Sequence, residues 1–227
     1  MKKVSAVIVA AGEGRRFGAA KQFELLRGRP VLDWSLEAFD AHPRVDEIIL
    51  VLPDVGAKNE SLAKYKKIAG VVQGGEKRQD SVVRGFRAID ARKAGIVLVH
   101  DGARPLAGPD LIGRIILAAR EKGAAIPALL LDETVKEAAG QGVIRTLDRT
   151  RVFRVQTPQG FSYPLLKRAL ESATAEKFYG TDEAALVERL GERVFIVDGD
   201  PKNIKITVPL DLRIAEAFLA DEDRNGV

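Results

Sequence analysis

The sequence contains no cysteine and is poor in histidine, methionine and aromatic residues. Among its 227 residues there are two histidines, one methionine and one tryptophan, and aromatic residues make up 6% of the chain. Without cysteine, neither disulfides nor cysteine-ligated metals are possible, and a cytoplasmic location is expected. The low aromatic content also argues against a protein that stacks the bases of single-stranded nucleic acid.

Long apolar runs and a strong excess of one charge are also absent. No stretch of about 18 apolar residues occurs, so the sequence predicts no transmembrane helix and no membrane partner. The 36 lysines and arginines nearly balance the 32 aspartates and glutamates, for a net charge of +4, which does not require nucleic acid as a partner. Residues 4–9 form a short β-branched run, which suits a first buried strand better than a signal peptide.

The sequence does contain a regular alternation of β-branched runs and helical patterns. We predict strands at residues 4–9, 47–52, 70–73, 96–100, 124–131 and 193–197. Apolar residues recur at helical spacing in residues 111–119 and 212–219. This alternation is typical of βαβ units in an α/β protein with a mostly parallel, twisted sheet. The length suits one substantial domain, here taken as residues 1–227.

One charged segment interrupts the alternation. Residues 133–138 and 143–149 flank the glycine-containing stretch 139–142, a pattern typical of a β-hairpin. The charges of this segment make it too polar for the core of the domain. Two interpretations remain open: a flap on the surface of the domain, or an arm that reaches a second subunit.

The first predicted strand leads into a glycine-rich turn at residues 10–22. Gly12 and Gly14 would let backbone N–H groups approach a phosphate at the carboxyl end of a strand, where open α/β sheets bind ligands. The glycine spacing differs from the dinucleotide and P-loop fingerprints. Arg15, Arg16 and Lys21 add positive charge that suits a triphosphate. The alternative is an ordinary turn with solvated basic residues.

A pair of glycines marks the next strand end. Gly74 and Gly75 stand between the strand predicted at 70–73 and the start of a helix. In the ordinary interpretation, Asp80 or Ser81 is the N-cap of that helix. Taken by itself, the segment does not indicate a binding site.

Asp101 follows the strand predicted at 96–100, at the edge of the sheet where the glycine-rich turn is expected. A carboxylate there is a candidate ligand of Mg²⁺, which takes one or two carboxylates plus phosphate oxygens. Alternatively, Asp101 caps the turn and pairs with Arg104. His100 is expected to pack in the core rather than to take part in chemistry. Lys205, between two isoleucines, would ordinarily be solvated surface.

In order along the chain, these segments resemble the sugar-phosphate nucleotidyltransferases, especially the 2-C-methyl-D-erythritol 4-phosphate cytidylyltransferase family of isoprenoid biosynthesis. The sequence departs from the family pattern at Ala20, Glu76 and Gly102. The resemblance extends from residue 10 to residue 212. The matching segments are residues 10–22, 74–82, 99–105, 132–136, 148–149, 156–159, 181–183 and 203–212.

The resemblance implies a three-layer α/β/α, Rossmann-like nucleotidyltransferase fold, in which residues 133–155 form an inserted β-arm that builds a homodimer. It implies CTP and a sugar-alcohol phosphate as substrates, and Mg²⁺ as a cofactor bound by Asp101. The catalytic residues would be Arg16, Lys21, Arg149 and Lys205. The nucleotide-binding residues would be Ala10, Ala11, Gly12, Gly14, Gly75, Glu76, Arg78, Ser81, Asp101 and Gly102, and the substrate-binding residues Arg104, Thr134, Thr157 and Thr181.

The reaction expected of such an enzyme transfers the cytidylyl group of CTP to 2-C-methyl-D-erythritol 4-phosphate and releases pyrophosphate. A ribitol 5-phosphate cytidylyltransferase is the nearest alternative, because its motifs are similar. A non-catalytic nucleotide- or RNA-binding protein is a third hypothesis. The few aromatic residues and the single, separated cations at the strand ends argue against it.

Overall fold

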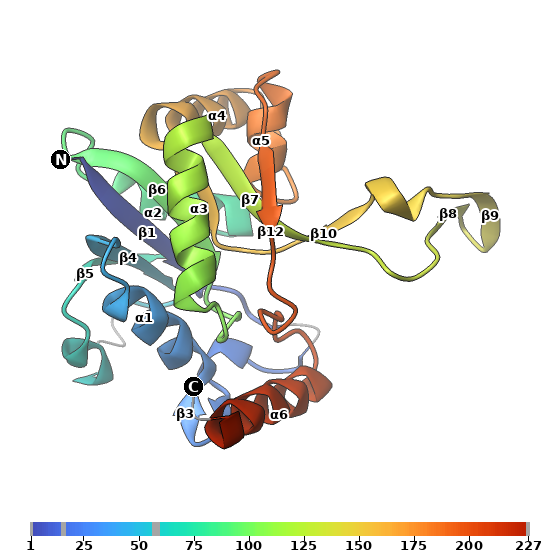
Figure 1. Cartoon of the computed structure of the whole chain (residues 1–227). Helices are drawn as coiled ribbons and strands as arrows, with labels where there is room; N and C mark the ends of the chain where they lie inside the picture. The colour runs from blue at the N-terminus through green and yellow to red at the C-terminus, as the bar shows by residue number, and fades with distance from the viewer. Residues whose placement is uncertain (1, 15–16, 56–59, 226–227) are drawn as a thin grey trace.

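The computed structural model describes residues 2–14, 17–55 and 60–225 of the chain. Within these residues, eight strands form a central sheet in the order β10-β7-β11-β6-β1-β4-β5, with β12 also paired to β7 (Figure 1). Two short ribbons, β2 with β3 and β8 with β9, lie apart from it. The strands of the central sheet are β1 (Lys3–Val9), β4 (Glu47–Leu52), β5 (Ile68–Gln73), β6 (Ala94–Asp101), β7 (Ala124–Leu130), β10 (Phe153–Val155), β11 (Gln159–Ser162) and β12 (Phe195–Asp198).

The sheet is mostly parallel, as the alternation of strands and helices predicts. β1 pairs in parallel with β4 and with β6, and β4 pairs in parallel with β5. β11 lies antiparallel between β6 and β7, and β10 is antiparallel to β7. Val9, at the end of β1, is in register with Val51 of β4 and with Asp101 of β6. The carboxyl ends of these three central strands therefore meet at one edge of the sheet.

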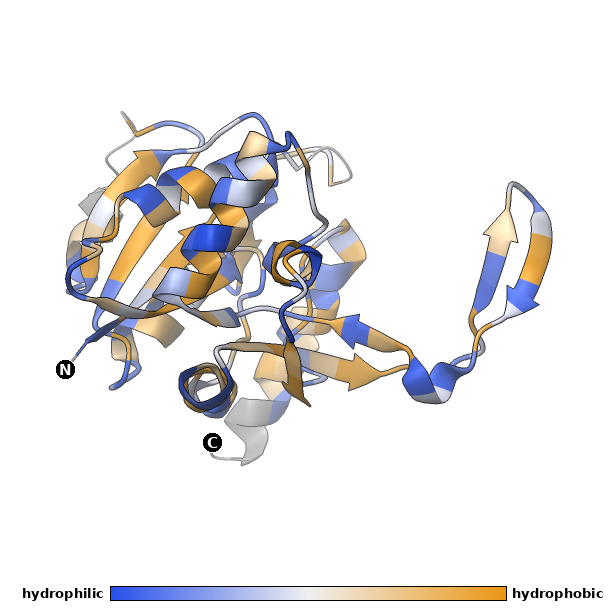
Figure 2. Ribbon diagram, turned by 90° about the horizontal axis from the view of Figure 1, so that it is seen from above, coloured by the Kyte–Doolittle hydropathy of each residue, from blue (hydrophilic) through white to orange (hydrophobic). Residues whose placement is uncertain are grey.

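Helices cover both faces of the sheet, which confirms the three-layer α/β/α arrangement. α1 and α3 pack on one face, and α2, α4 and α5 pack on the other. The side chains of β1 alternate between the two cores, with Ala6 and Ile8 on the first face and Val7 on the second. The central strands are therefore apolar along most of their length (Figure 2). The helices are α1 (Val31–Ala41), α2 (Arg78–Arg87), α3 (Pro109–Lys122), α4 (Tyr163–Ala175), α5 (Glu183–Arg189) and α6 (Pro209–Asn225).

The C-terminal helix α6 closes a small third cluster outside the two main cores. Its residues Ala215 and Leu219 pack with Leu26 of β2 (Leu25–Leu26), which pairs with β3 (Arg29–Pro30). Ile206, just before the helix, is buried in the same cluster and donates its N–H to the carbonyl of Ala103 at 2.8 Å. This packing holds the segment before α6 against the loop that follows β6.

Between β7 and β10 the chain leaves the sheet as a long arm, visible in both views (Figure 1, Figure 2). The arm carries the antiparallel hairpin of β8 (Lys136–Ala139) and β9 (Gly142–Thr146), in which every residue is exposed, followed by the short helix η3 (Arg149–Arg151). The hairpin predicted from the charged segment is thus confirmed. β10 lies within the predicted arm range of 133–155, yet it hydrogen-bonds to β7 in the main sheet.

All six predicted strands are present, the one predicted at 193–197 lying at Phe195–Asp198. The helical patterns at 111–119 and 212–219 lie within α3 and α6. β10 and β11 were not predicted, because strands of three and four residues on either side of Pro158 are too short for a recognisable alternation. Among the described helices, none has both the length and the apolar character needed to cross a membrane.

Candidate active site

A pocket of about 490 Å³ opens where the central strands end. It lies between the glycine-rich loop after β1, the start of α2, the end of β6 and the segment before α6. Four cations and three carboxylates are among the described residues that line it. The predicted site residues that line the pocket are Ala10, Ala11, Gly12, Gly14, Lys21, Gly75, Glu76, Arg78, Ser81, Asp101 and Lys205. Arg16, predicted to be catalytic, lies outside the described residues.

The glycine-rich loop folds back on itself beside the pocket. Gly14 adopts a φ of +67°, and a Cβ at this position would lie 1.8 Å from the carbonyl oxygen of Ala19, so only glycine fits. The buried Gln22 donates its side-chain amide to the carbonyl of Gly12 at 3.1 Å. Lys21 begins the short helix η1 (Lys21–Phe23) at the end of this loop. The loop therefore brings a lysine and a tight backbone turn to the same wall of the pocket.

The turn before α2 packs directly against this loop. A Cβ on Gly74 would lie 2.2 Å from the Cβ of Ala11, so a larger residue would push the two loops apart. The hydroxyl of Ser81 accepts a hydrogen bond from the N–H of Gly75 at 3.0 Å. The N-terminus of α2, with its partial positive charge, therefore faces the pocket.

The capping prediction for α2 was wrong. Lys77 occupies the N-cap position, and Asp80 and Ser81 lie inside the first turn. The Asp80 carboxylate accepts the N–H of Lys77 at 3.0 Å. The Asp80 side chain stabilises the helix start by accepting the N–H of the N-cap residue, whereas the Ser81 hydroxyl holds the turn before the helix through Gly75.

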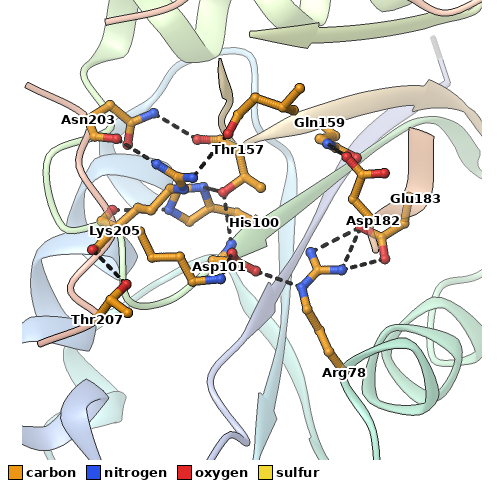
Figure 3. Close-up of polar contacts among 12 residues, drawn as sticks. Arg78, His100, Asp101, Thr157, Gln159, Asp182, Glu183, Asn203, Lys205 and Thr207 are labelled. Carbon is orange, nitrogen blue, oxygen red and sulfur yellow. Dashed lines mark hydrogen bonds and ion pairs between the residues drawn. The ribbon is translucent and has the colours of Figure 1, made fainter. Parts of the chain in front are cut away.

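Asp101 binds two cations, one on each carboxylate oxygen (Figure 3). Nε of Arg78 donates to Oδ1 at 2.8 Å, and Nζ of Lys205 donates to Oδ2 at 2.5 Å. Burial by itself would raise the pKa of Asp101, but the charges of Arg78 and Lys205 outweigh it and hold this pKa well below its usual range. The ordinary interpretation of Lys205 as solvated surface therefore does not hold, since the ammonium pairs with a buried carboxylate.

The alternative pairing of Asp101 with Arg104 is also wrong. The guanidinium of Arg104 turns the other way and donates to the carbonyl of Asn203 at 2.7 Å. Asn203 is itself fully buried and donates its amide to the carbonyl of Thr157 at 2.9 Å. Arg104 therefore ties the loop after β6 to the segment that carries Lys205, behind the pocket rather than in it.

His100 and Thr157 hold the backbone of Asp101 through a chain of hydrogen bonds. Burial lowers the pKa of His100 to about 3, so its ring is neutral, as expected for a packing role. Nε2 lies 3.2 Å from the Arg104 carbonyl, which only accepts, so the proton is on Nε2. Nδ1 then accepts from the Thr157 hydroxyl at 3.1 Å, and the same hydroxyl accepts the N–H of Asp101 at 3.1 Å. Thr157 thus positions Asp101 instead of lining the pocket.

Several predicted residues are not brought into the pocket of this chain. Gly102 lies behind it, and its N–H donates to the carbonyl of Val9 at 2.9 Å. Thr134 and Arg149 are exposed on the arm, where Arg149 donates to the carbonyl of Asp132. Thr181 is exposed in the turn before α5 and does not line the pocket either.

Sequence reasoning missed part of the site. Lys77 and Thr207 line the pocket beside predicted residues, and their positions next to Arg78 and two residues after Lys205 were the available signals. Glu183 is buried and pairs with Arg78. It lies in the segment 181–183 that resembles the family, but no role was predicted for it. In the described part of the chain, no group of three or more histidine or carboxylate side chains could hold a metal ion.

An open, mostly parallel sheet whose strand ends carry a glycine-rich loop and a group of cations defines a Rossmann-like nucleotide-binding protein. A family model, 2-C-methyl-D-erythritol 4-phosphate cytidylyltransferase, matches residues 4–221. The chain belongs to this family. The resemblance noted from the sequence is thereby confirmed.

Individual relatives agree with this assignment over nearly the whole chain. The cytidylyltransferase of this name from Syntrophus aciditrophicus is 44% identical, with 97% of each chain covered. That from Symbiobacterium thermophilum is 43% identical, covering 97% of this chain and 94% of the relative. The crystal structure of the enzyme from Thermus thermophilus has a TM-score of 0.80 at 36% identity, covering 95% of this chain and 98% of that one. The synthase structure from Anaerococcus prevotii has a TM-score of 0.85 at 35% identity, covering 96% and 99%.

Proposed function

We propose that this chain transfers the cytidylyl group of CTP to 2-C-methyl-D-erythritol 4-phosphate, giving 4-diphosphocytidyl-2-C-methyl-D-erythritol and pyrophosphate. The observation that carries this proposal is the family match over residues 4–221, together with a pocket that gathers cations from three separate segments beside a glycine-rich loop. Nucleotidyl transfer asks little covalent chemistry of a protein, because positioning and charge neutralisation dominate. This pocket is suited to both.

The nucleotide would lie along the loop after β1 and the start of α2. Ala10, Ala11 and the glycine pair before α2 leave backbone groups accessible to the edge of a pyrimidine, and Ser81 lies beside them. The triphosphate would follow the turn at Gly12 towards Lys21. The cations that line the pocket and the N-terminus of α2 would both stabilise the anionic phosphates.

The acceptor phosphate supplies the nucleophile. One of its oxygens attacks the α-phosphorus of CTP, the bond from that phosphorus to the bridging oxygen breaks, and pyrophosphate leaves with the electron pair. No general base is needed, because the phosphate is already ionised at neutral pH. Lys21 and Arg16 would stabilise the charge that develops on the transferred and leaving groups. Lys205 and Arg149 would hold the acceptor phosphate for attack.

Among the three described carboxylates that line the pocket, Asp101 is the one that we expect to hold Mg²⁺. Its carboxylate lines the pocket, and each oxygen accepts a hydrogen bond from a cation, which leaves room on each for a metal ion. A single carboxylate is sufficient where the substrate phosphates supply the other oxygens. When bound, the ion would neutralise part of the phosphate charge.

The arm is the part of the proposal that involves a second copy of the chain. Val143 and Ile144, on β9, are 63% and 60% exposed, and a contact with a second chain would remove this apolar surface from water. Thr134 and Arg149 are exposed on the same arm. We place them at the acceptor side of the partner's pocket in a homodimer, with Thr181 of the pocket's own chain nearby.

A pyrophosphate-release assay tests the function directly. Each of CTP, UTP, ATP and GTP is combined with either 2-C-methyl-D-erythritol 4-phosphate or ribitol 5-phosphate. Turnover with CTP and the methylerythritol phosphate alone is the expected result. Preference for ribitol 5-phosphate would support the alternative acceptor, and comparable turnover with ATP would contradict the cytidylyl assignment. Binding of CTP without any pyrophosphate release would favour the non-catalytic hypothesis.

A further inference from the structure

Glu183 is a buried carboxylate to which the reaction scheme assigns no role. It is the first residue of α5, and its side chain is 1% exposed. Its two oxygens accept hydrogen bonds from the guanidinium of Arg78, at 2.7 and 3.0 Å from Nη1 and at 3.0 Å from Nη2. Burying a carboxylate is costly unless a partner compensates its charge, and here Arg78 is that partner.

The same guanidinium also faces Asp101. Figure 3 shows Arg78 between the two carboxylates, with its Nη atoms towards Glu183 and its Nε towards Asp101. Lys205 occupies the other oxygen of Asp101. Glu183, Arg78, Asp101 and Lys205 therefore form a chain of alternating charges that connects α5, α2, the end of β6 and the segment before α6.

The orientation of Arg78 depends on which carboxylate takes its planar fork. A guanidinium pairs most favourably with a carboxylate or a phosphate through two parallel hydrogen bonds. Glu183 takes that pairing, so Asp101 receives a single hydrogen bond from Nε. Without the charge of Glu183, the fork of Arg78 would be available to Asp101, and Lys205 would compete with it for the carboxylate.

We propose that Glu183 is a positioning residue that acts through Arg78. By holding the Nη groups of Arg78, it limits Arg78 to one oxygen of Asp101 and leaves the other to Lys205. This inference rests on the proposed function: in that reaction, Glu183 keeps Asp101 and Lys205 in place for the phosphates of the substrates. Arg78 then serves mainly as a link between carboxylates, rather than as the nucleotide-binding residue expected from the sequence.

A double-mutant cycle separates this role from a contribution to folding. Glu183→Gln should lower kcat about tenfold in the presence of Arg78, but less than about twofold when Arg78 is replaced by glutamine. Glu183→Asp, which keeps the charge, should recover part of the lost kcat. The dissociation constant for CTP, measured by calorimetry without acceptor, should stay within about twofold of wild type in Glu183→Gln. Equal losses of kcat in both backgrounds that follow the loss in Tm would overturn the proposal.

Asp182→Asn is the matched control, because it removes the neighbouring carboxylate. Asp182 caps α5 by accepting the N–H of Ala185 at 2.9 Å, and its other carboxylate oxygen accepts from the side-chain amide of Gln159. Among the described residues, it forms no hydrogen bond with Arg78 or Asp101. This variant should lower Tm while keeping kcat within about twofold.

A second measurement does not depend on turnover. The ¹⁵N–¹H resonance of Arg78 Nε in the unliganded protein should shift in Glu183→Gln and stay in place in Asp182→Asn, because it reports the hydrogen bond to Asp101. An unmoved resonance in Glu183→Gln would refute the positioning role whatever the reaction proves to be. A wild-type protein without pyrophosphate release would instead refute the proposed function.

Discussion

Asp101 accepts a hydrogen bond from Arg78 at 2.8 Å and another from Lys205 at 2.5 Å. These three side chains form a cluster of charges in the pocket. An exposed ion pair contributes little to stability, whereas breaking the pair between a cation and a buried carboxylate is costly, so that the two side chains stay together. The side chain of Asp101 is 11% exposed and that of Lys205 33%, so the pair is partly shielded from water. Individual side chains of this site therefore have restricted positions before any substrate binds.

Among single residues, Lys21 is expected to act mainly on the transition state. It lines the pocket at the end of the glycine-rich loop, where the triphosphate is proposed to lie. Lys21→Ala should lower kcat more than it raises KM for CTP, because the lysine is proposed to stabilise charge that develops in the transition state. If the loss resembles that of an oxyanion-type donor, it amounts to about 2.7–4 kcal/mol, or roughly 10²–10³ in kcat.

Steady-state kinetics with CTP as the varied substrate provides the measurement for Lys21→Ala. Lys167→Ala is a suitable control, because Lys167 lies on the exposed side of α4 and pairs with Glu171. An increase in KM with kcat unchanged would mean that Lys21 binds substrate and transition state equally, contrary to the proposed role.

Among the structural elements, the turn that leads into α2 has the largest part in nucleotide recognition as proposed. Its backbone approaches the loop after β1 because Gly74 lacks a Cβ that would meet Ala11. Ser81 anchors the turn through the N–H of Gly75 at 3.0 Å. The conformation of the turn and the access to its backbone groups are therefore coupled.

Ser81→Ala should weaken CTP binding with little effect on the chemical step. Loss of a hydrogen bond of about 1 kcal/mol corresponds to an increase in KM for CTP of roughly fivefold, with kcat within about twofold. Relative turnover with UTP should rise, because the anchored turn is proposed to read the base. Kinetics with both nucleotides measures this, and Ser172→Ala on α4 is the control. A large fall in kcat at unchanged KM would be inconsistent with a role in recognition.

At the scale of the whole molecule, Arg149 is exposed on the arm and does not line the pocket of its own chain. The hairpin of the arm extends away from the sheet in both views (Figure 1, Figure 2). In a two-fold dimer, each arm would reach the other subunit's pocket reciprocally. Each active site would then combine Lys205 of one chain with Arg149 of the other.

Subunit exchange tests this arrangement. Arg149→Ala and Lys205→Ala, each nearly inactive alone, are mixed at equal concentration. About half of the dimers would be mixed, each with one intact and one doubly damaged site, so activity should return to roughly a quarter of wild type. Differently tagged subunits verify that mixed dimers form. If they form and the mixture stays inactive, Arg149 acts within its own chain and the shared site is refuted.

Much of the fold could be predicted because its signals are local. The strands β1, β4 and β6 are continuous apolar runs, and the hairpin of the arm is a charged pattern around a glycine-containing turn. Residues at or just beyond the carboxyl end of a strand, such as Asp101 and Gly12, were also predicted for the pocket, because parallel strands end at a common edge. Each of these inferences depends on residues close together in the chain.

By itself, then, the sequence determined the α/β class, the arm, the glycine-rich loop and, through its family, the chemistry. Only the tertiary structure decided the partners of the charges: Arg78 meets Glu183 across 105 positions, and Lys205 meets Asp101 across 104. It also decided that Arg104 and Thr157 support the pocket from behind. The physical reason is that such pairs form when separate helices and loops pack on the same sheet edge, which local periodicity cannot reveal.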